Sequence, residues 1–272
     1  MHAIRWLFAL AIPVVMAGCA ISTQQEVALG AEYAAQVDSE LPIIHDAALQ
    51  RYIDVLGDSI AHVTSRADLD WHFAIVNTDV VNAFALPGGF VYVNRGIVEN
   101  ADRMDELAGV MAHEIGHVVK RHSVKQMQQA QGANVGVSLV CILTHVCESG
   151  LGQTAINAGG TLLFAKFSRE DEQQADEEGF SYLVKAGISP QGMVSFFQKL
   201  LEMEQKSGGS SVPGWFSDHP LTQDRIADIQ NLVNRLPPAT LGTLTEDTRA
   251  FQDFKARIMA LPPAPAPKES SQ

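Results

Sequence analysis

The segment that most constrains this chain is residues 101–122, ADRMDELAGVMAHEIGHVVKRH, which contains the motif HEIGH at 113–117. On an α-helix, two residues four positions apart lie on the same face, so the imidazoles of His113 and His117 can reach one metal ion with Glu114 beside them. A catalytic zinc site takes nitrogen, sulfur or carboxylate ligands and keeps one position for water. The spacing therefore predicts a hydrolytic zinc site in which Glu114 accepts a proton from that water.

The same segment is predicted to be a buried helix. Asp102 stands where an N-cap is expected, and Lys120, Arg121 and His122 follow in the last turn, where the helix dipole favours cations. Apolar residues occupy nearly every side, which is typical of a helix with no solvent-exposed face. Because unpaired polar groups are costly in a core, the two histidines and the glutamate need partners from elsewhere in the chain.

A third ligand is expected from a second helix, which begins near Ser168 with the sequence SREDEQQADEEG. At 100° per residue, Glu172 and Asp176 share the face that should meet the core. Two inward acids one turn apart repel each other unless a cation or donor compensates them, and a zinc ion with its histidines would do so. The pattern with a third histidine six residues after His117 is excluded, because Ser123 occupies that position. Glu172 is the distant glutamate whose helix face fits.

HEIGH, the later SREDEQQADEEG and the earlier NAFALPGGFVYVNRG occur in an order that resembles the HtpX-like, CAAX-prenyl-protease type of gluzincin metallopeptidase. The resemblance covers roughly residues 70–235 and, with the N-terminal segment described below, is similar to the LoiP-like lipoproteins of that family. It implies one zinc ion per chain, with Glu114 as general base and Asp176 orienting a ligand imidazole. The zinc ligands that it implies are His113, His117 and Glu172.

The resemblance also singles out two residues that the sequence pattern alone does not. His219, in Asp218-His219-Pro220, would either stabilise the oxyanion or take the fourth zinc position in a resting form, unless it is an ordinary loop histidine. Arg225 would help to shape the same pocket. The other histidines are expected to be ordinary surface or structural residues: His45, His62, His72, His122 and His145.

The predicted fold class is α+β, a mainly helical zincin-type core with a small antiparallel β-sheet beside the HExxH helix. Alternating apolar residues near 71–75 and 90–93 predict strands, and Pro87-Gly88-Gly89 predicts a turn before the second of them. In metallopeptidases an edge strand beside the zinc holds the substrate through backbone hydrogen bonds. One of these strands is expected to do so; the alternative is a sheet that only packs.

The chain is expected to divide into four parts. After a leader at 1–18, residues 19–66 form amphipathic helices near 24–39 and 46–63 that belong to the catalytic domain. The metallopeptidase core spans 67–240 and includes helices near 190–206 and beyond Leu221. Residues 241–272 form a last helix, near 246–261, and a Pro/Ala-rich disordered tail.

The leader is expected to be a lipoprotein signal peptide. A basic residue precedes an apolar run, and VMAGC at 15–19 resembles a bacterial lipobox, whose cysteine, here Cys19, becomes the lipidated first residue. An ordinary cleaved signal and an uncleaved anchor are the alternatives. Ala20 after the cysteine favours the outer membrane, so the chain is expected on its periplasmic face, held by a lipid anchor.

Two further cysteines, Cys141 and Cys147, stand in CILTHVC. Export to an oxidising compartment favours a disulfide between them; the alternatives are two buried thiols, or zinc ligation together with His145. A formal net charge of −12 argues against a nucleic-acid partner, which would need basic clustering.

These features together predict a zinc endopeptidase of the cell envelope. The resemblance and the location imply unfolded or misassembled periplasmic and outer-membrane proteins as substrates, and the outer-membrane assembly machinery as a partner. One alternative is a chaperone or assembly factor for outer-membrane proteins in which peptidase activity is latent. Another is a metal-dependent hydrolase of cell-wall amide bonds.

Overall fold

The computed structural model describes residues 21–132, 167–206, 215 and 219–264. The leader at 1–18, Cys19, Cys141 and Cys147 lie outside the described residues, as does the tail from residue 265. The lipid anchor and the disulfide therefore stay predictions. In the part that the structure describes, every helix is too short or too polar to cross a membrane.

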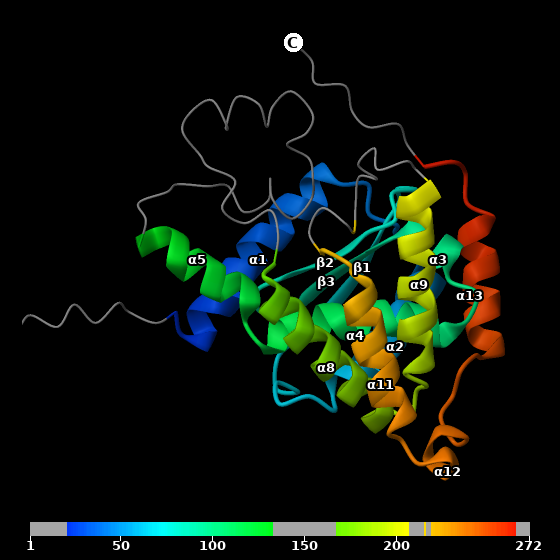
Figure 1. The fold of residues 1–272 in the computed structure, drawn as a ribbon. Helices are drawn as coiled ribbons and strands as arrows, with labels where there is room; N and C mark the ends of the chain where they lie inside the picture. Colours follow the sequence, from blue (N-terminus) through cyan, green and yellow to red (C-terminus); the bar gives the residue numbers. More distant parts are fainter. Residues whose placement is uncertain (1–20, 133–166, 207–214, 216–218, 265–272) are drawn as a thin grey trace, which may run out of the picture.

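Helix α4 (Met104–Val119) lies at the centre of the molecule, between a small sheet and a group of helices (Figure 1). It packs along α8 (Arg169–Lys185) and α9 (Gln191–Lys206), and on its other sides it meets α2 (Ala47–Ala61) and the strand β2 (Ala83–Leu86). Every residue of α4 from Met104 to Val118 is buried. The apolar pattern correctly predicted a helix with no exposed face.

The sheet has three strands in the order β1-β3-β2 and is mixed, not antiparallel as predicted. β2 pairs antiparallel with β3 (Phe90–Asn94) across a turn in which Gly88 and Gly89 have φ of 83° and 107°. β1 (His72–Val76) pairs parallel with the other side of β3. β3 therefore lies between β1 and β2 in the sheet, and the chain runs in the same direction along β1 and β3.

The remaining elements surround this centre. The predicted helices near 24–39 and 46–63 are α1 (Thr23–Glu40) and α2, and the short α3 (Arg95–Asn100) follows β3. On the C-terminal side, α11 (Gln223–Asn234) packs against α8 and α9, and α13 (Arg249–Met259) packs against α2 and α3. A single turn, α12 (Pro238–Leu241), joins them. The fold class is confirmed as mainly helical with a small sheet, and the domain limits stay predictions.

Both ends of α4 differ from the prediction. Its N-cap is Arg103, because the Asp102 carboxylate pairs with Lys199 at 2.7 Å while its backbone N–H donates to Glu106 Oε2 at 2.6 Å. At the other end the helix stops at Val119, and Arg121 has a φ of 59°, in the left-handed region. A new helix, α5 (His122–Gly132), starts after this break.

Candidate metal centre

The three predicted ligands converge in one buried group. His113 and His117 lie one turn apart on α4, and Glu172 faces them from the first turn of α8. The His113 Nε2 and His117 Nε2 atoms are 3.0 Å apart, and Glu172 Oε1 is 3.5 Å from the latter. His219 completes the group, and one ligand atom from each of the four residues lies within 4.8 Å of all the others.

Two glycines let α4 and α8 approach closely enough for this. A Cβ at Gly116 would lie 2.8 Å from the backbone oxygen of Ala175, and a Cβ at Gly179 would lie 3.2 Å from the backbone of Ala112 and of His113. Larger residues at these positions would push the helices apart. The glycines inside HEIGH and at the end of ADEEG therefore bring the ligands of two helices to one point.

On the His113 side, a carboxylate and a guanidinium support the imidazole. His113 Nδ1 lies 2.9 Å from Asp176 Oδ1, as the resemblance implied for an orienting residue. Arg225 on α11 donates to Asp176 through Nε at 2.7 Å and Nη2 at 2.8 Å, and its Nη1 forms an ion pair with Glu172. Arg225 thus compensates both of the inward acids on α8.

On the His117 side, the partner is a residue that the sequence analysis assigned no role. His122 Nδ1 lies 2.8 Å from His117 Nδ1, and His122 is 1% exposed. His122 Nε2 lies 3.2 Å from Gln174 Oε1 and 3.5 Å from Asp171 Oδ1, both on α8. His122 is therefore not an ordinary surface histidine: it is buried and contacts a predicted metal ligand. The one sequence signal was a third histidine directly after HEIGHVVKR.

His219 stands between the base and the third ligand. Its Nδ1 is 2.9 Å from Glu172 Oε1, and its Nε2 is 3.3 Å from Glu114 Oε1. The indole of Trp215 stacks on the His219 ring with centroids 4.5 Å apart, and the Phe167 ring lies 4.0 Å from that of His117. These aromatic rings enclose the group, in which His219 is 1% exposed.

Burial sets the protonation of the group. It lowers the pKa of the imidazoles of His113, His117 and His122, most strongly for His117, so the neutral forms that bind metals are favoured. Burial raises the pKa of Glu172, but the neighbouring His219 and His117 outweigh it and hold that pKa well below its usual value. The Glu172 carboxylate is therefore kept ionised.

The donor set fits a divalent transition metal. Imidazole nitrogens and one carboxylate are what zinc takes in hydrolytic sites. At the site, three buried carboxylates, those of Glu114, Glu172 and Asp176, outnumber one buried guanidinium, that of Arg225. A divalent cation would compensate this excess of buried negative charge.

Comparison with known proteins agrees with this constellation. The sequence profile of peptidase family M48 matches residues 47–233, a span that contains the whole group. The chain belongs to peptidase family M48. The resemblance inferred from the motifs is thereby confirmed.

Three curated relatives illustrate the likeness of this M48 chain. It is 34% identical to the "Beta-barrel assembly-enhancing protease" of Yersinia pestis over 254 residues, 90% of the chain and 50% of the relative. It is 34% identical to the "Metalloprotease LoiP" of Escherichia coli K12 over 158 residues, 57% of the chain and 59% of the relative. To the "Mitochondrial metalloendopeptidase OMA1" of Schizosaccharomyces pombe it is 30% identical over 210 residues, 77% of the chain and 59% of the relative. The chain spans about half the length of the first relatives it matches.

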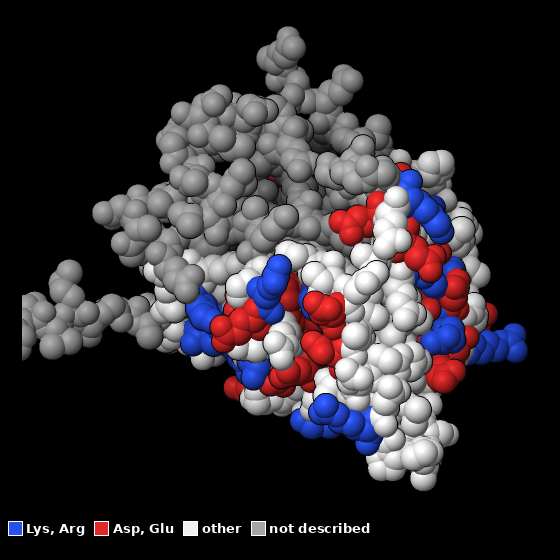
Figure 2. Space-filling view, viewed as in Figure 1, with Lys and Arg blue, Asp and Glu red and all other residues white. Residues whose placement is uncertain are grey.

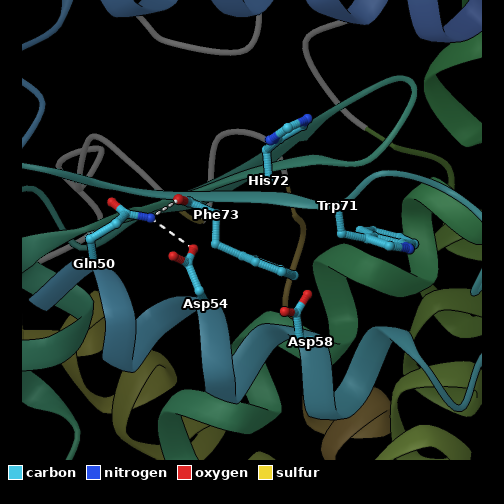
Figure 3. A pocket seen from close by; sticks show the side chains of 6 residues that line it. All are labelled: Gln50, Asp54, Asp58, Trp71, His72 and Phe73. Atoms are coloured by element: carbon cyan, nitrogen blue, oxygen red, sulfur yellow. Dashed lines mark hydrogen bonds between the residues drawn. The ribbon is translucent and has the colours of Figure 1, made fainter. Parts of the chain in front are cut away.

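A separate hollow between α2 and β1 of this M48 chain carries two aspartates, Asp54 and Asp58 (Figure 3). Gln50 Nε2 donates to Asp54 Oδ1 at 2.8 Å and to the Phe73 backbone oxygen at 2.7 Å, so it ties the helix to the strand. The His72 side chain points away from both aspartates. The hollow therefore brings no metal-binding combination together.

The outer face of α8 contrasts with its inner face. Figure 2 shows acidic side chains gathered over this helix, where Glu170 and Glu177 are exposed. Glu178 nearby is paired with Lys120 at 2.6 Å. In this M48 chain one helix thus presents a solvated acidic face outward, while Glu172 and Asp176 face inward as the 100° spacing predicted and Asp171 is buried as well.

Proposed function

We propose that this chain is a zinc-dependent endopeptidase of the bacterial cell envelope. The observation that carries the proposal is the group of four buried ligand atoms within 4.8 Å of one another, with the Glu114 carboxylate beside it. A purely structural zinc site does not need a carboxylate in the position of a base. The residues proposed to hold the ion are His113, His117 and Glu172.

Zinc, when bound, supplies Lewis-acid chemistry that lowers the pKa of water toward ~7 and polarises a carbonyl oxygen. Glu114 accepts a proton from the attacking water and then gives it to the leaving amine as the peptide C–N bond breaks. Asp176 holds His113 through Nδ1, which leaves Nε2 unprotonated toward the group. Trp215 and Phe167 keep bulk water away from the reacting atoms.

His219 is proposed to hold the site in a resting form. Its ring contacts both Glu114 and Glu172, at 3.3 Å and 2.9 Å, so it lies beside the proposed base and the proposed third ligand. With an ion bound, His219 would be the fourth ligand of the resting form and would have to move away to admit substrate. The alternative is that His219 donates to the developing oxyanion and does not block the site.

This assignment makes a directional prediction. His219→Ala is expected to raise the rate of cleavage of an unfolded protein such as casein several-fold, because the resting form is lost. A lower rate at unchanged zinc content would instead assign His219 to oxyanion stabilisation alone.

The substrate is proposed to bind along β2. This strand packs against α4 and, among the described strands, is hydrogen-bonded on one side only, to β3. A peptide in extended conformation can add to such an edge through its backbone, which gives little sequence preference. That mode suits an enzyme whose substrates are unfolded chains.

The proposed cellular location is based on the lipobox, and the proposed substrates are based on the names of the relatives. A lipidated Cys19 would hold the enzyme on the periplasmic face of the outer membrane. One relative is named a beta-barrel assembly-enhancing protease, which supports unfolded or misassembled envelope proteins as substrates and the outer-membrane assembly machinery as a partner. No nucleic-acid partner is proposed.

The test compares the full-length wild type with Glu114→Gln for zinc content and casein cleavage. Both proteins are expected to bind one zinc ion per chain, and only the wild type to cut. If neither protein bound zinc, the proposed centre would be wrong.

The enclosed arrangement of His219 favours one alternative, a chaperone for outer-membrane proteins with latent peptidase activity. In that case both proteins would bind zinc and neither would cut. Outer-membrane protein assembly in cells would then be supported equally well by Glu114→Gln and by the wild type.

A further inference from the structure

The two histidines of α4 have different hydrogen-bond partners: His113 contacts the Asp176 carboxylate, and His117 contacts the imidazole of His122. His117 and His122 face each other through their Nδ1 atoms at 2.8 Å. Both side chains are buried, at 2% and 1% exposed. The role of His122 inferred below rests on the proposed metal site, in which His117 is a ligand.

The position of each proton follows from counting donors and acceptors. A short contact between two Nδ1 atoms needs one N–H donor and one lone pair. His117 Nε2 faces the metal group, 3.0 Å from His113 Nε2, so a metal-binding His117 must carry its proton on Nδ1. His122 must then accept at Nδ1 and carry its own proton on Nε2.

The surroundings of His122 supply the matching acceptors. Its Nε2 lies 3.2 Å from Gln174 Oε1 and 3.5 Å from Asp171 Oδ1. The chain of donors therefore runs in one direction, from His117 to His122 and on to α8. Reversing it would put the His117 proton on the nitrogen that the metal needs.

The backbone is built to hold His122 in this place. Arg121, with φ of 59°, ends α4 and turns the chain into α5. The Arg121 Nε donates to the buried Glu26 at 2.7 Å, and Arg66 pairs with the same carboxylate at 2.7 Å. The turn that places His122 next to His117 is thus tied to α1 by an ion pair between Arg121 and the buried Glu26.

We propose that His122 is a positioning residue that fixes the metal-binding tautomer and ring orientation of His117. It does so as a hydrogen-bond acceptor, and its contribution is to metal affinity. Asp176 acts in the same way on His113, but as a carboxylate.

The experiment compares two variants of nearly equal shape in the full-length chain. His122→Leu removes the acceptor, and zinc affinity measured by competition with a chromophoric chelator is expected to fall by roughly 10- to 100-fold. His122→Asn keeps an acceptor close to the position of Nδ1 and is expected to stay within about 3-fold of the wild type. His62→Leu, at an exposed histidine, is the matched control and should leave affinity unchanged.

A second measurement needs no variant. Nitrogen NMR of the zinc-loaded wild type, labelled with ¹⁵N-histidine, should show the proton of His117 on Nδ1 and that of His122 on Nε2. A His122 protonated on Nδ1 would overturn the proposal. So would equal zinc affinities of the Leu and Asn variants.

The outcomes also separate this inference from the proposed function. If the wild type bound no zinc, both would fail. If the wild type bound zinc and His122→Leu bound it equally well, only the role of His122 would be lost.

Discussion

The two halves of the proposed metal centre differ in how they are stabilised. His113 rests on a charged pair, Asp176 with Arg225, whereas His117 rests on a second imidazole, His122. A carboxylate in direct contact with both imidazoles would add a negative charge to an interior that already contains three buried acids of α8, Asp171, Glu172 and Asp176. A neutral acceptor orients the ring without that desolvation cost. The difference indicates that one proposed ligand, His113, is oriented by direct contact with a charged carboxylate, whereas the other, His117, is oriented by direct contact with an imidazole.

The largest expected effect comes from removing the Arg225 guanidinium on the His113 side of the site. Arg225→Met leaves Glu172 and Asp176 as buried acids without their cation, and is expected to destabilise the metal-free protein by about 3–5 kcal/mol. Zinc should restore part of that loss because it supplies positive charge to the same place. Urea unfolding with and without a chelator measures both quantities.

The control for that experiment is Arg257→Met, which removes an exposed ion pair with Asp46 and should change the free energy of unfolding little. An Arg225→Met protein as stable as this control would show that the acids are compensated in another way.

The next largest effect on stability is expected at the contact between α4 and α8, which positions both halves of the site. Gly116→Ala places a methyl group 2.8 Å from the Ala175 oxygen and should push α8 away from α4, at a cost of about 1–3 kcal/mol. Gly179→Ala meets the backbone at 3.2 Å and should cost less. Thermal unfolding and zinc competition measured on both variants would check the order, and a larger effect at Gly179 would contradict it.

Asp176→Asn sharpens the comparison on the charged side. The amide oxygen still accepts from His113, but its NH₂ group faces the donors of Arg225. Zinc affinity is expected to fall by roughly 10- to 100-fold, similar to His122→Leu. The double variant should lose more than either single one, since the two partners hold different ligands. Chelator competition on the three proteins measures this, and a double variant no worse than Asp176→Asn would mean that only one half controls affinity.

The smallest effect concerns pH. Burial lowers the pKa of His113, His117 and His122, so below about pH 6.5 the unfolded chain binds more protons than the folded chain. The metal-free protein should therefore lose stability as the pH falls from 7 to 5. His122→Asn removes one of the three groups and should reduce that slope by at most about 1.4 kcal/mol per pH unit. Chelated samples unfolded at a series of pH values would test it; an unchanged slope would mean that His122 does not titrate with folding.

Periodicity predicted the elements and faces that depend on local geometry. Glu172 and Asp176 were correctly directed inward because the 100° spacing of a helix fixes which residues share a face. The same rule failed for His122. On a continuous helix, a residue five positions after His117 would point about 140° away from it, but the break at Arg121 turns His122 back.

The sequence by itself determined a buried helix with two histidines on one face, a second helix that turns Glu172 and Asp176 inward, and the class of enzyme, because each depends on spacing within one element. Only the tertiary structure decided that β1 pairs parallel with β3, that Arg225 compensates two acids about fifty residues away in sequence, and that His122 supports His117. These features join elements that are distant in sequence or separated by a left-handed residue. Their geometry depends on how the helices pack, which no local period encodes.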